Sequence, residues 1–191
     1  MSKDYEPIPI PDHISKGEGE MRAAAEAFRA EMGRRHTVRD FATTPVPRAV
    51  IDDCVAAAGL APSGANHQPW HFVAISDPKI KAEIRRAAEE EEERFYAGAA
   101  GDEWLSALEP IGTGVSKPHL EDAPWLIVIF AQRYGLREDG SRFKHYYVPE
   151  STGIASGFLI AALHHAGLSC LTHTPAPMNF LRDICGRPEH A

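Results

Sequence analysis

The sequence is short of cysteine, of basic charge and of long apolar runs, and each shortage excludes a class of protein. Its 191 residues include 3 cysteines without a CxxC pair, so neither a disulfide framework nor a thiolate metal site is expected. The formal net charge of -7 argues against nucleic acid or an anionic membrane as a partner, because both need a basic face. No apolar run is long enough to cross a bilayer. We therefore expect a single-domain cytoplasmic protein.

Common ligand-binding motifs are also missing. Residues 1–20 carry prolines, glycines and charges without an apolar stretch, which predicts a loosely held arm and no secretory signal. Neither GxxxxGK[ST] nor GxGxxG is present, which excludes a P-loop and a Rossmann fingerprint. The histidines lack HExxH spacing, so no metal is expected.

Apolar periodicity predicts a mixed succession of helices and strands. Helical spacing is found at 21–32, 47–58, 79–96, 151–165 and 179–185, and strand-like runs at 70–75, 125–130 and 168–172. The helix at 151–165 is apolar nearly all round and rich in small residues, so it is expected to be a buried central helix or a dimer interface. Residues 97–122 are rich in glycine and predict a mobile segment with one short helix near 103–108.

The loop at 61–70 is stiff and polar. Pro62 and Pro69 fix φ at its two ends, Gly64 lets backbone approach a ligand closely, and Ser63 offers a short polar contact. These features fit a cofactor seat, and they fit equally a rigid connection between a helix and a strand.

One dense basic cluster, at 34–39, follows the first predicted helix of this acidic chain. Fork-shaped guanidinium groups beside the Thr37 hydroxyl suit a phosphate monoester, with each charged hydrogen bond contributing ~1.5 to 3 kcal/mol. The alternative is a basic helix C-terminus that complements the macrodipole, which is worth only ~0.3 to 1 kcal/mol and does not need Thr37. We favour the phosphate site.

Four segments together resemble the nitroreductase superfamily of FMN enzymes, in the same order along the chain. They are the cluster at 34–39, the loop at 61–70, the helix around Gly153-Ile154-Ala155-Ser156-Gly157, and Leu171-Thr172-His173-Thr174-Pro175. The resemblance implies an α+β nitroreductase fold with a central mixed sheet flanked by helices, and an intertwined homodimer with FMN between the subunits. It divides the chain into an arm and first helix at 1–33 and an FMN domain at 34–191, with a mobile active-site lid at about 90–120.

Within that superfamily the chain looks most like the iodotyrosine deiodinase branch, and three residues carry this likeness. Glu92 and Tyr96 are four apart and share a helix face, and Lys117 follows in the next loop. A free amino acid presents an ammonium to Glu92 and a carboxylate to Lys117, while Tyr96 adds a hydroxyl and an aromatic face. Without the resemblance, Glu92 would be taken as part of a solvated glutamate run at 89–93.

The resemblance also implies roles for further residues. The phosphate segment would comprise Arg35, His36, Thr37 and Arg39, although related proteins commonly have a second arginine in place of His36. Flavin contacts are implied for Ser63, Gly64, Thr172, His173 and Thr174, with Thr172 as the candidate donor to flavin N5 that permits one-electron transfer. The Ala65 N–H would hold the substrate's phenolate oxygen.

The expected activity is therefore reductive dehalogenation of halotyrosine, converting 3-iodo-L-tyrosine to L-tyrosine and iodide with electrons ultimately from NAD(P)H or a reductase. Two alternatives remain: a general nitroreductase or quinone reductase using the same FMN, and a flavin-binding protein without turnover. Related proteins continue into a further strand and a C-terminal arm, whereas this sequence ends at Ala191. A truly truncated chain is expected to bind FMN poorly.

Overall fold

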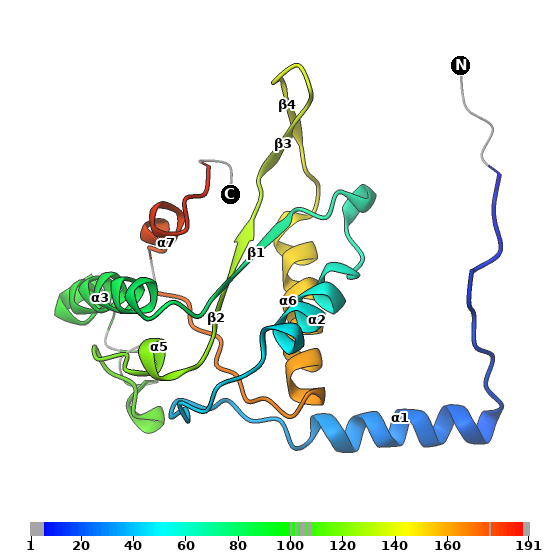
Figure 1. The fold of residues 1–191 in the computed structure, drawn as a ribbon, viewed down its shortest axis with the longest axis horizontal. Coiled ribbons are helices and arrows are strands. Elements are labelled where there is room, and N and C mark those ends of the chain that lie inside the picture. Colours follow the sequence, from blue (N-terminus) through cyan, green and yellow to red (C-terminus); the bar gives the residue numbers. More distant parts are fainter. Residues whose placement is uncertain are drawn as a thin grey trace. The chain divides into compact units, whose positions relative to one another are not determined.

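The structure, a computed structural model, describes residues 6–99, 101, 103, 106, 108–175 and 177–188. The chain forms two compact units, Met1–Arg35 and His36–Ala191. In the first unit, helix α1 (Glu18–Met32) begins three residues before the predicted range, where the Gly17 N–H donates to the Glu20 carboxylate at 2.8 Å (Figure 1). Arg34 and Arg35 follow in the turn that ends this helix, and both belong to this unit.

In the second unit, helices α2 (Arg48–Gly59) and α6 (Val148–His165) pack against each other. The buried cluster between them is apolar and consists of Ile51, Cys54, Ala58, Leu159 and Leu163. The opposite side of α6 is exposed, with Ile154 at 42% and Phe158 at 44% exposure. The predicted all-round apolar helix is therefore buried on one face, and an apolar face remains uncovered in the single chain.

Three further helices lie on the other side of the strands. Helix α3 (Pro78–Arg94) begins where the Asp77 carboxylate accepts hydrogen bonds from two backbone N–H groups, and it continues into a π-helical turn at Phe95–Ala99. The short helix α5 (His119–Asp122) follows the expected lid segment, and α7 (Asn179–Ile184) agrees with the last predicted helix. The short helix expected near 103–108 lies largely outside the described residues.

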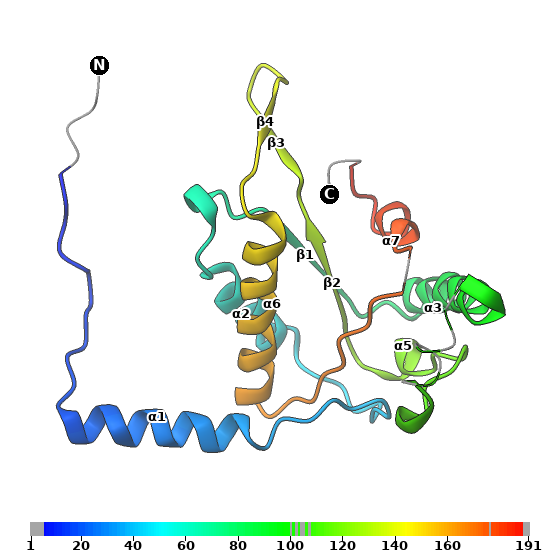
Figure 2. The ribbon, with the colours of Figure 1, turned by 180° about the vertical axis from the view of Figure 1, so that it is seen from behind.

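Two antiparallel strands, β1 (Trp70–Ile75) and β2 (Leu126–Ala131), lie between these helix groups (Figures 1 and 2). Successive side chains of a strand point to opposite faces, so Ile127 packs toward α2 and α6, while Val128 packs toward α3 and α7. Helices on both faces explain why β2 is a continuous apolar run, as the sequence predicted.

The remaining predicted strand, at 168–172, is reduced to a single parallel bridge between Cys170 and Thr37. The Val38 N–H donates to the Cys170 carbonyl at 3.4 Å, and this is a long hydrogen bond. The bridge nevertheless places the segment that carries Arg39 beside the segment that carries Thr172. The bridge is isolated from the antiparallel β1–β2 sheet, so the parallel pairing lies outside that sheet.

A hairpin of β3 (Tyr134–Leu136) and β4 (Arg142–Lys144) was not predicted. Its turn contains Asp139-Gly140, with Gly140 at φ +79°, and this dipeptide is a strong hairpin signal in sequence.

No helix among the described residues is long and apolar enough to span a membrane. The same residues contain no group of three or more metal-ligating side chains placed to hold an ion.

Candidate active site

A cavity of about 440 Å³ lies in the second unit, within the size range of small-molecule sites. Its walls are the end of α3, the loop at 111–118, the extended segment at 171–174 and the residues around Arg39. It brings together seven of the predicted site residues, which are Arg39, Glu92, Tyr96, Lys117, Thr172, His173 and Thr174. Residues distant in sequence thus form one polar site.

Glu92 and Lys117 form a buried ion pair in this cavity. The Lys117 Nζ lies 3.2 Å from Glu92 Oε2, and the two side chains are only 4% and 13% exposed. The same ammonium donates to the Thr113 hydroxyl at 3.3 Å and to the Gly114 carbonyl at 2.5 Å. A buried charge needs such compensation, so these contacts hold one group of each sign in place. We call Glu92, Tyr96 and Lys117 the clamp.

Tyr96 completes the clamp with a hydroxyl and a ring. Its hydroxyl donates to the Thr113 carbonyl at 3.3 Å, and its ring centroid lies 6.0 Å from Lys117 Nζ, within the range of a cation–π contact. Burial and the nearby Glu92 charge raise the pKa of Tyr96, so the phenol stays protonated and remains a hydrogen-bond donor at neutral pH.

A pair of histidines joins the clamp to the segment at 171–174. The His173 Nε2 lies 3.4 Å from Glu92 Oε1, and its ring meets that of His119 edge to face, with centroids 5.3 Å apart. Burial lowers the pKa of His173 against the opposing effect of Glu92. Sequence reasoning did not place His119 here, although its position two residues after Lys117 was the available signal.

His119 is held neutral in this wall. Its Nε2 is buried and accepts or donates no hydrogen bond among the described residues. Burial, and then the positive groups around it, lower its pKa from 6.5 to about 4. The His119 ring, which lines the cavity, is therefore uncharged at neutral pH.

Stability is consequently expected to fall as the solution is acidified. Between pH 6.5 and about 4, His119 becomes protonated in the unfolded chain while it stays neutral in the native chain. The free energy of unfolding is therefore highest above pH 6.5 and falls as the pH is lowered from 6.5 to about 4. His119→Gln should give a shallower decline in the free energy of unfolding, measured in urea at pH 7 and pH 5. His13→Gln, in the exposed arm, is the control. Equal slopes in all three proteins would contradict this assignment.

The loop that holds Ser63, Gly64 and Ala65 is built for rigidity. The Ser63 Oγ accepts the Gln68 N–H at 2.8 Å, and the Ser151 Oγ of α6 accepts the Gly64 N–H at 3.3 Å. A Cβ on Gly64 would lie 2.8 Å from the Tyr146 carbonyl oxygen, so only glycine fits here. Gly64 thus permits close approach of the protein's own backbone, where the sequence suggested a ligand.

Ala65 has an unusual backbone conformation and an available donor. Its φ of +51° is in the left-handed region, which a side chain disfavours. Within the described part of the chain no group accepts a hydrogen bond from the Ala65 N–H. The loop is not among the cavity's lining residues. One chain therefore presents two separate groups of predicted site residues.

The predicted phosphate segment is divided between the two units. Arg35 ends the first unit, whereas His36, Thr37 and Arg39 begin the second. Arg39 lines the cavity and forms no ion pair among the described residues, although acidic residues outnumber basic ones in the chain. An unpaired guanidinium beside the Thr172 and Thr174 segment fits an anionic ligand group.

Comparison with known proteins identifies the family of the chain. A family model described as "Nitroreductase family" matches residues 32–191, which is most of the chain. The chain therefore belongs to the nitroreductase family. The fold is similar to a crystal structure of oxidized iodotyrosine deiodinase bound to FMN and 3-iodo-L-tyrosine, with a TM-score of 0.76 and 29% identity. The match covers 85% of this chain and 83% of that chain.

Sequence relatives narrow the family to one branch. The chain is 53% identical to an iodotyrosine deiodinase of Haliscomenobacter hydrossis over 90% of its own length and 77% of the relative. It is 42% identical to an iodotyrosine deiodinase of Nematostella vectensis, and the match covers 96% of this chain and 70% of the relative. It is 40% identical to human iodotyrosine deiodinase 1, with 98% of this chain and 65% of the relative covered. These likenesses place the chain in the iodotyrosine deiodinase branch, among oxidoreductases.

Proposed function

We propose that this protein is an FMN-dependent enzyme that removes iodide from 3-iodo-L-tyrosine to give L-tyrosine. The observation that carries the proposal is the buried Glu92–Lys117 pair beside Tyr96. An amino acid zwitterion is its charge complement, because the ammonium can pair with Glu92 and the carboxylate with Lys117. A plain nitroreductase substrate has no such groups to satisfy.

The donor set of the cavity fits FMN. Arg39, with Thr37 on the adjoining extended segment, would hold the phosphate, together with Arg35 and His36 as the resemblance implies. The segment at 172–174, with His173 between two threonines, would lie along the flavin edge, and Ser63 and Gly64 would contact it from the loop. Bound FMN supplies the reducing electrons.

The chain's own groups would then position the substrate. The clamp holds its amino acid end and excludes water from the cavity, which strengthens each charged contact. The Ala65 N–H, available and held in a rigid loop, would donate to the phenolate oxygen. Binding energy from the amino acid end thereby orients the distant halogenated ring.

A homodimer would unite the two groups of site residues. The cavity and the Ala65 loop are separate in one chain, so we propose that the loop of one protomer reaches the cavity of its partner. The exposed apolar face of α6, with Ile154 and Phe158, supports this, because such a face requires a cover. The hydrogen bond from Gly64 to Ser151 ties the loop to the same helix.

The physiological electrons are proposed to come from NAD(P)H, directly or through a reductase, in the cytoplasm. The three cysteines form no disulfide in the described part of the chain, which fits a reducing compartment.

The function is tested with anaerobically reduced, FMN-loaded protein. Addition of 3-iodo-L-tyrosine should reoxidise the flavin and release one equivalent of iodide per two electrons, measured by absorbance and by an iodide electrode. Protein that is not reoxidised and releases no iodide would overturn the assignment. Tyrosine, which carries no halogen, is the control substrate.

Thr172 is the proposed hydrogen-bond donor to flavin N5. Thr172→Ala should slow single-turnover iodide release by about tenfold, the value of one good hydrogen bond in the transition state. Thr174→Ala is the matched variant, because residues two apart on an extended segment point the same way. If Thr174→Ala alone slows the step, Thr174 is the donor and the role of Thr172 is refuted.

A further inference from the structure

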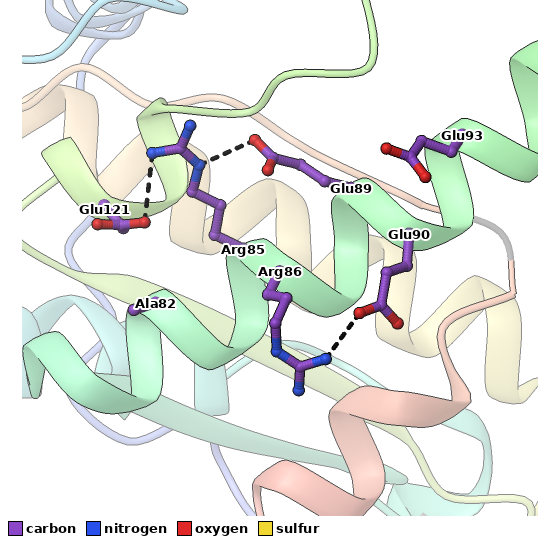
Figure 3. A pocket seen from close by; sticks show the side chains of 7 residues that line it. All are labelled: Ala82, Arg85, Arg86, Glu89, Glu90, Glu93 and Glu121. Atoms are coloured by element: carbon purple, nitrogen blue, oxygen red, sulfur yellow. Dashed lines mark hydrogen bonds and ion pairs between the residues drawn. The ribbon is translucent and has the colours of Figure 1, made fainter.

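A network of charged side chains lies along α3 and reaches Glu121 (Figure 3). Arg85 is its centre, because its Nε donates to Glu89 Oε1 at 2.8 Å and its NH1 to Glu121 Oε1 at 3.2 Å. Glu121 belongs to α5, so Arg85 connects α3 to the helix that follows the lid loop. No site residue predicted from the sequence belongs to this network.

Glu89 makes the contact that links the network to the clamp. Its Oε1 accepts the backbone N–H of Lys117 at 2.7 Å, and also the Ser116 hydroxyl at 3.4 Å. Burial opposes ionisation, but the hydrogen bonds from Lys117 and Arg85 outweigh it and lower the pKa of Glu89. The carboxylate is therefore charged at neutral pH and holds the loop by a charge-assisted hydrogen bond.

Lys117 is consequently attached to α3 at both ends. Glu89 binds its backbone N–H, and Glu92, one helical turn later, binds its ammonium at 3.2 Å. When a substrate ammonium competes for Glu92, the side-chain attachment weakens. The backbone attachment then becomes the contact to α3 that keeps Lys117 in reach of the substrate carboxylate.

We infer that Glu89 is a positioning residue for the substrate clamp, which fixes Lys117 without touching the substrate. This inference rests on the proposed function. It specifies that Glu89 governs affinity for ligands with an amino acid end, and that it has little influence on ligands lacking one. Arg85 assists by orienting the Glu89 carboxylate and by holding α5.

The matched control for Glu89 is Glu90. It neighbours Glu89 on α3 and pairs with Arg86 at 2.7 Å, but its side chain is 50% exposed and forms no hydrogen bond or ion pair with the described residues of the loop at 111–118. Both glutamates therefore have an arginine partner four residues earlier, and only one of them reaches Lys117. Any general effect of removing a helix charge appears in both variants.

The test uses FMN-loaded full-length protein and measures dissociation constants from flavin fluorescence. Glu89→Ala should weaken 3-iodo-L-tyrosine binding about tenfold or more, because a charged hydrogen bond is lost. Glu89→Gln keeps an accepting oxygen without the charge, and it should weaken binding about threefold. Binding of 2-iodophenol, which has no amino acid end, should change less than about twofold in either variant.

A second readout is independent of flavin and substrate. Hydrogen exchange at the Lys117 amide should be faster in Glu89→Ala than in the wild type or Glu90→Ala. The positioning role would be overturned if Glu89→Ala bound 3-iodo-L-tyrosine as tightly as Glu90→Ala does. It would also be overturned if Glu89→Ala lowered the affinity for 3-iodo-L-tyrosine and for 2-iodophenol by the same factor. Wild-type protein that fails to bind 3-iodo-L-tyrosine would instead overturn the proposed function itself.

Discussion

Lys117→Ala is expected to lower the affinity for 3-iodo-L-tyrosine about thirtyfold or more. Truncating one partner of a buried charge pair costs ~2 to 5 kcal/mol, and each ~1.4 kcal/mol is a factor of ten. The variant loses the partner for the substrate carboxylate and leaves Glu92 buried without its ammonium. The measurement is the dissociation constant, with Lys79→Ala, an exposed lysine early in α3, as the control.

A double-mutant cycle makes this prediction specific to the pair. Glu92→Gln should also weaken binding strongly, but the double variant should be less impaired than the sum of the two single effects, because neither charge is then left unpaired. In these variants the rate of reduction of a small nitroaromatic should fall by a much smaller factor than the affinity for 3-iodo-L-tyrosine. Equal losses for both ligands would favour a general nitroreductase without an amino acid clamp.

Phe158→Glu is expected to convert the proposed homodimer into monomers. The side chain is exposed on the apolar face of α6, and a carboxylate covered there by a partner would cost several kcal/mol (~3 or more) of association free energy. Sedimentation velocity should show the smaller species, and FMN affinity should fall, since the loop and the cavity would no longer meet.

Met178→Glu provides the matched comparison. Met178 is 46% exposed against 44% for Phe158, but it precedes α7, which packs on the opposite face of the strands. This variant should remain dimeric. A Phe158→Glu protein with unchanged sedimentation would show that α6 is not the interface.

Strong local patterns made much of the fold predictable. The strand at Trp70–Ile75 follows from β-rich residues that end at an Asp-Pro boundary, and the long charged helix follows from its period and the Asp77 cap. The hairpin was missed although Asp139-Gly140 marked its turn. The strand expected at 168–172 depended on a pairing partner far away in sequence, and only Cys170 pairs there.

The site residues likewise divide into those that a local pattern predicts and those that depend on distant packing. Glu92 and Tyr96 share a face because helical spacing requires it, so their proximity was predictable. Which of five consecutive glutamates accepts the Lys117 backbone N–H depends on where the loop at 111–118 packs, and no local pattern identifies Glu89. The conformation of Ala65 was equally hidden, since alanine gives no sign of a positive φ.

The long hydrogen bond between Val38 and Cys170 gives the cofactor a role beyond chemistry. Two walls of the cavity are extended segments that this bridge joins, and its hydrogen bond is too long to contribute much cohesion. A ligand that spans both walls adds further cross-links and stabilises the native state by ~2.7 kcal/mol at about a hundred times its dissociation constant. The supply of flavin in the cell would then set how much of this protein persists in the folded state.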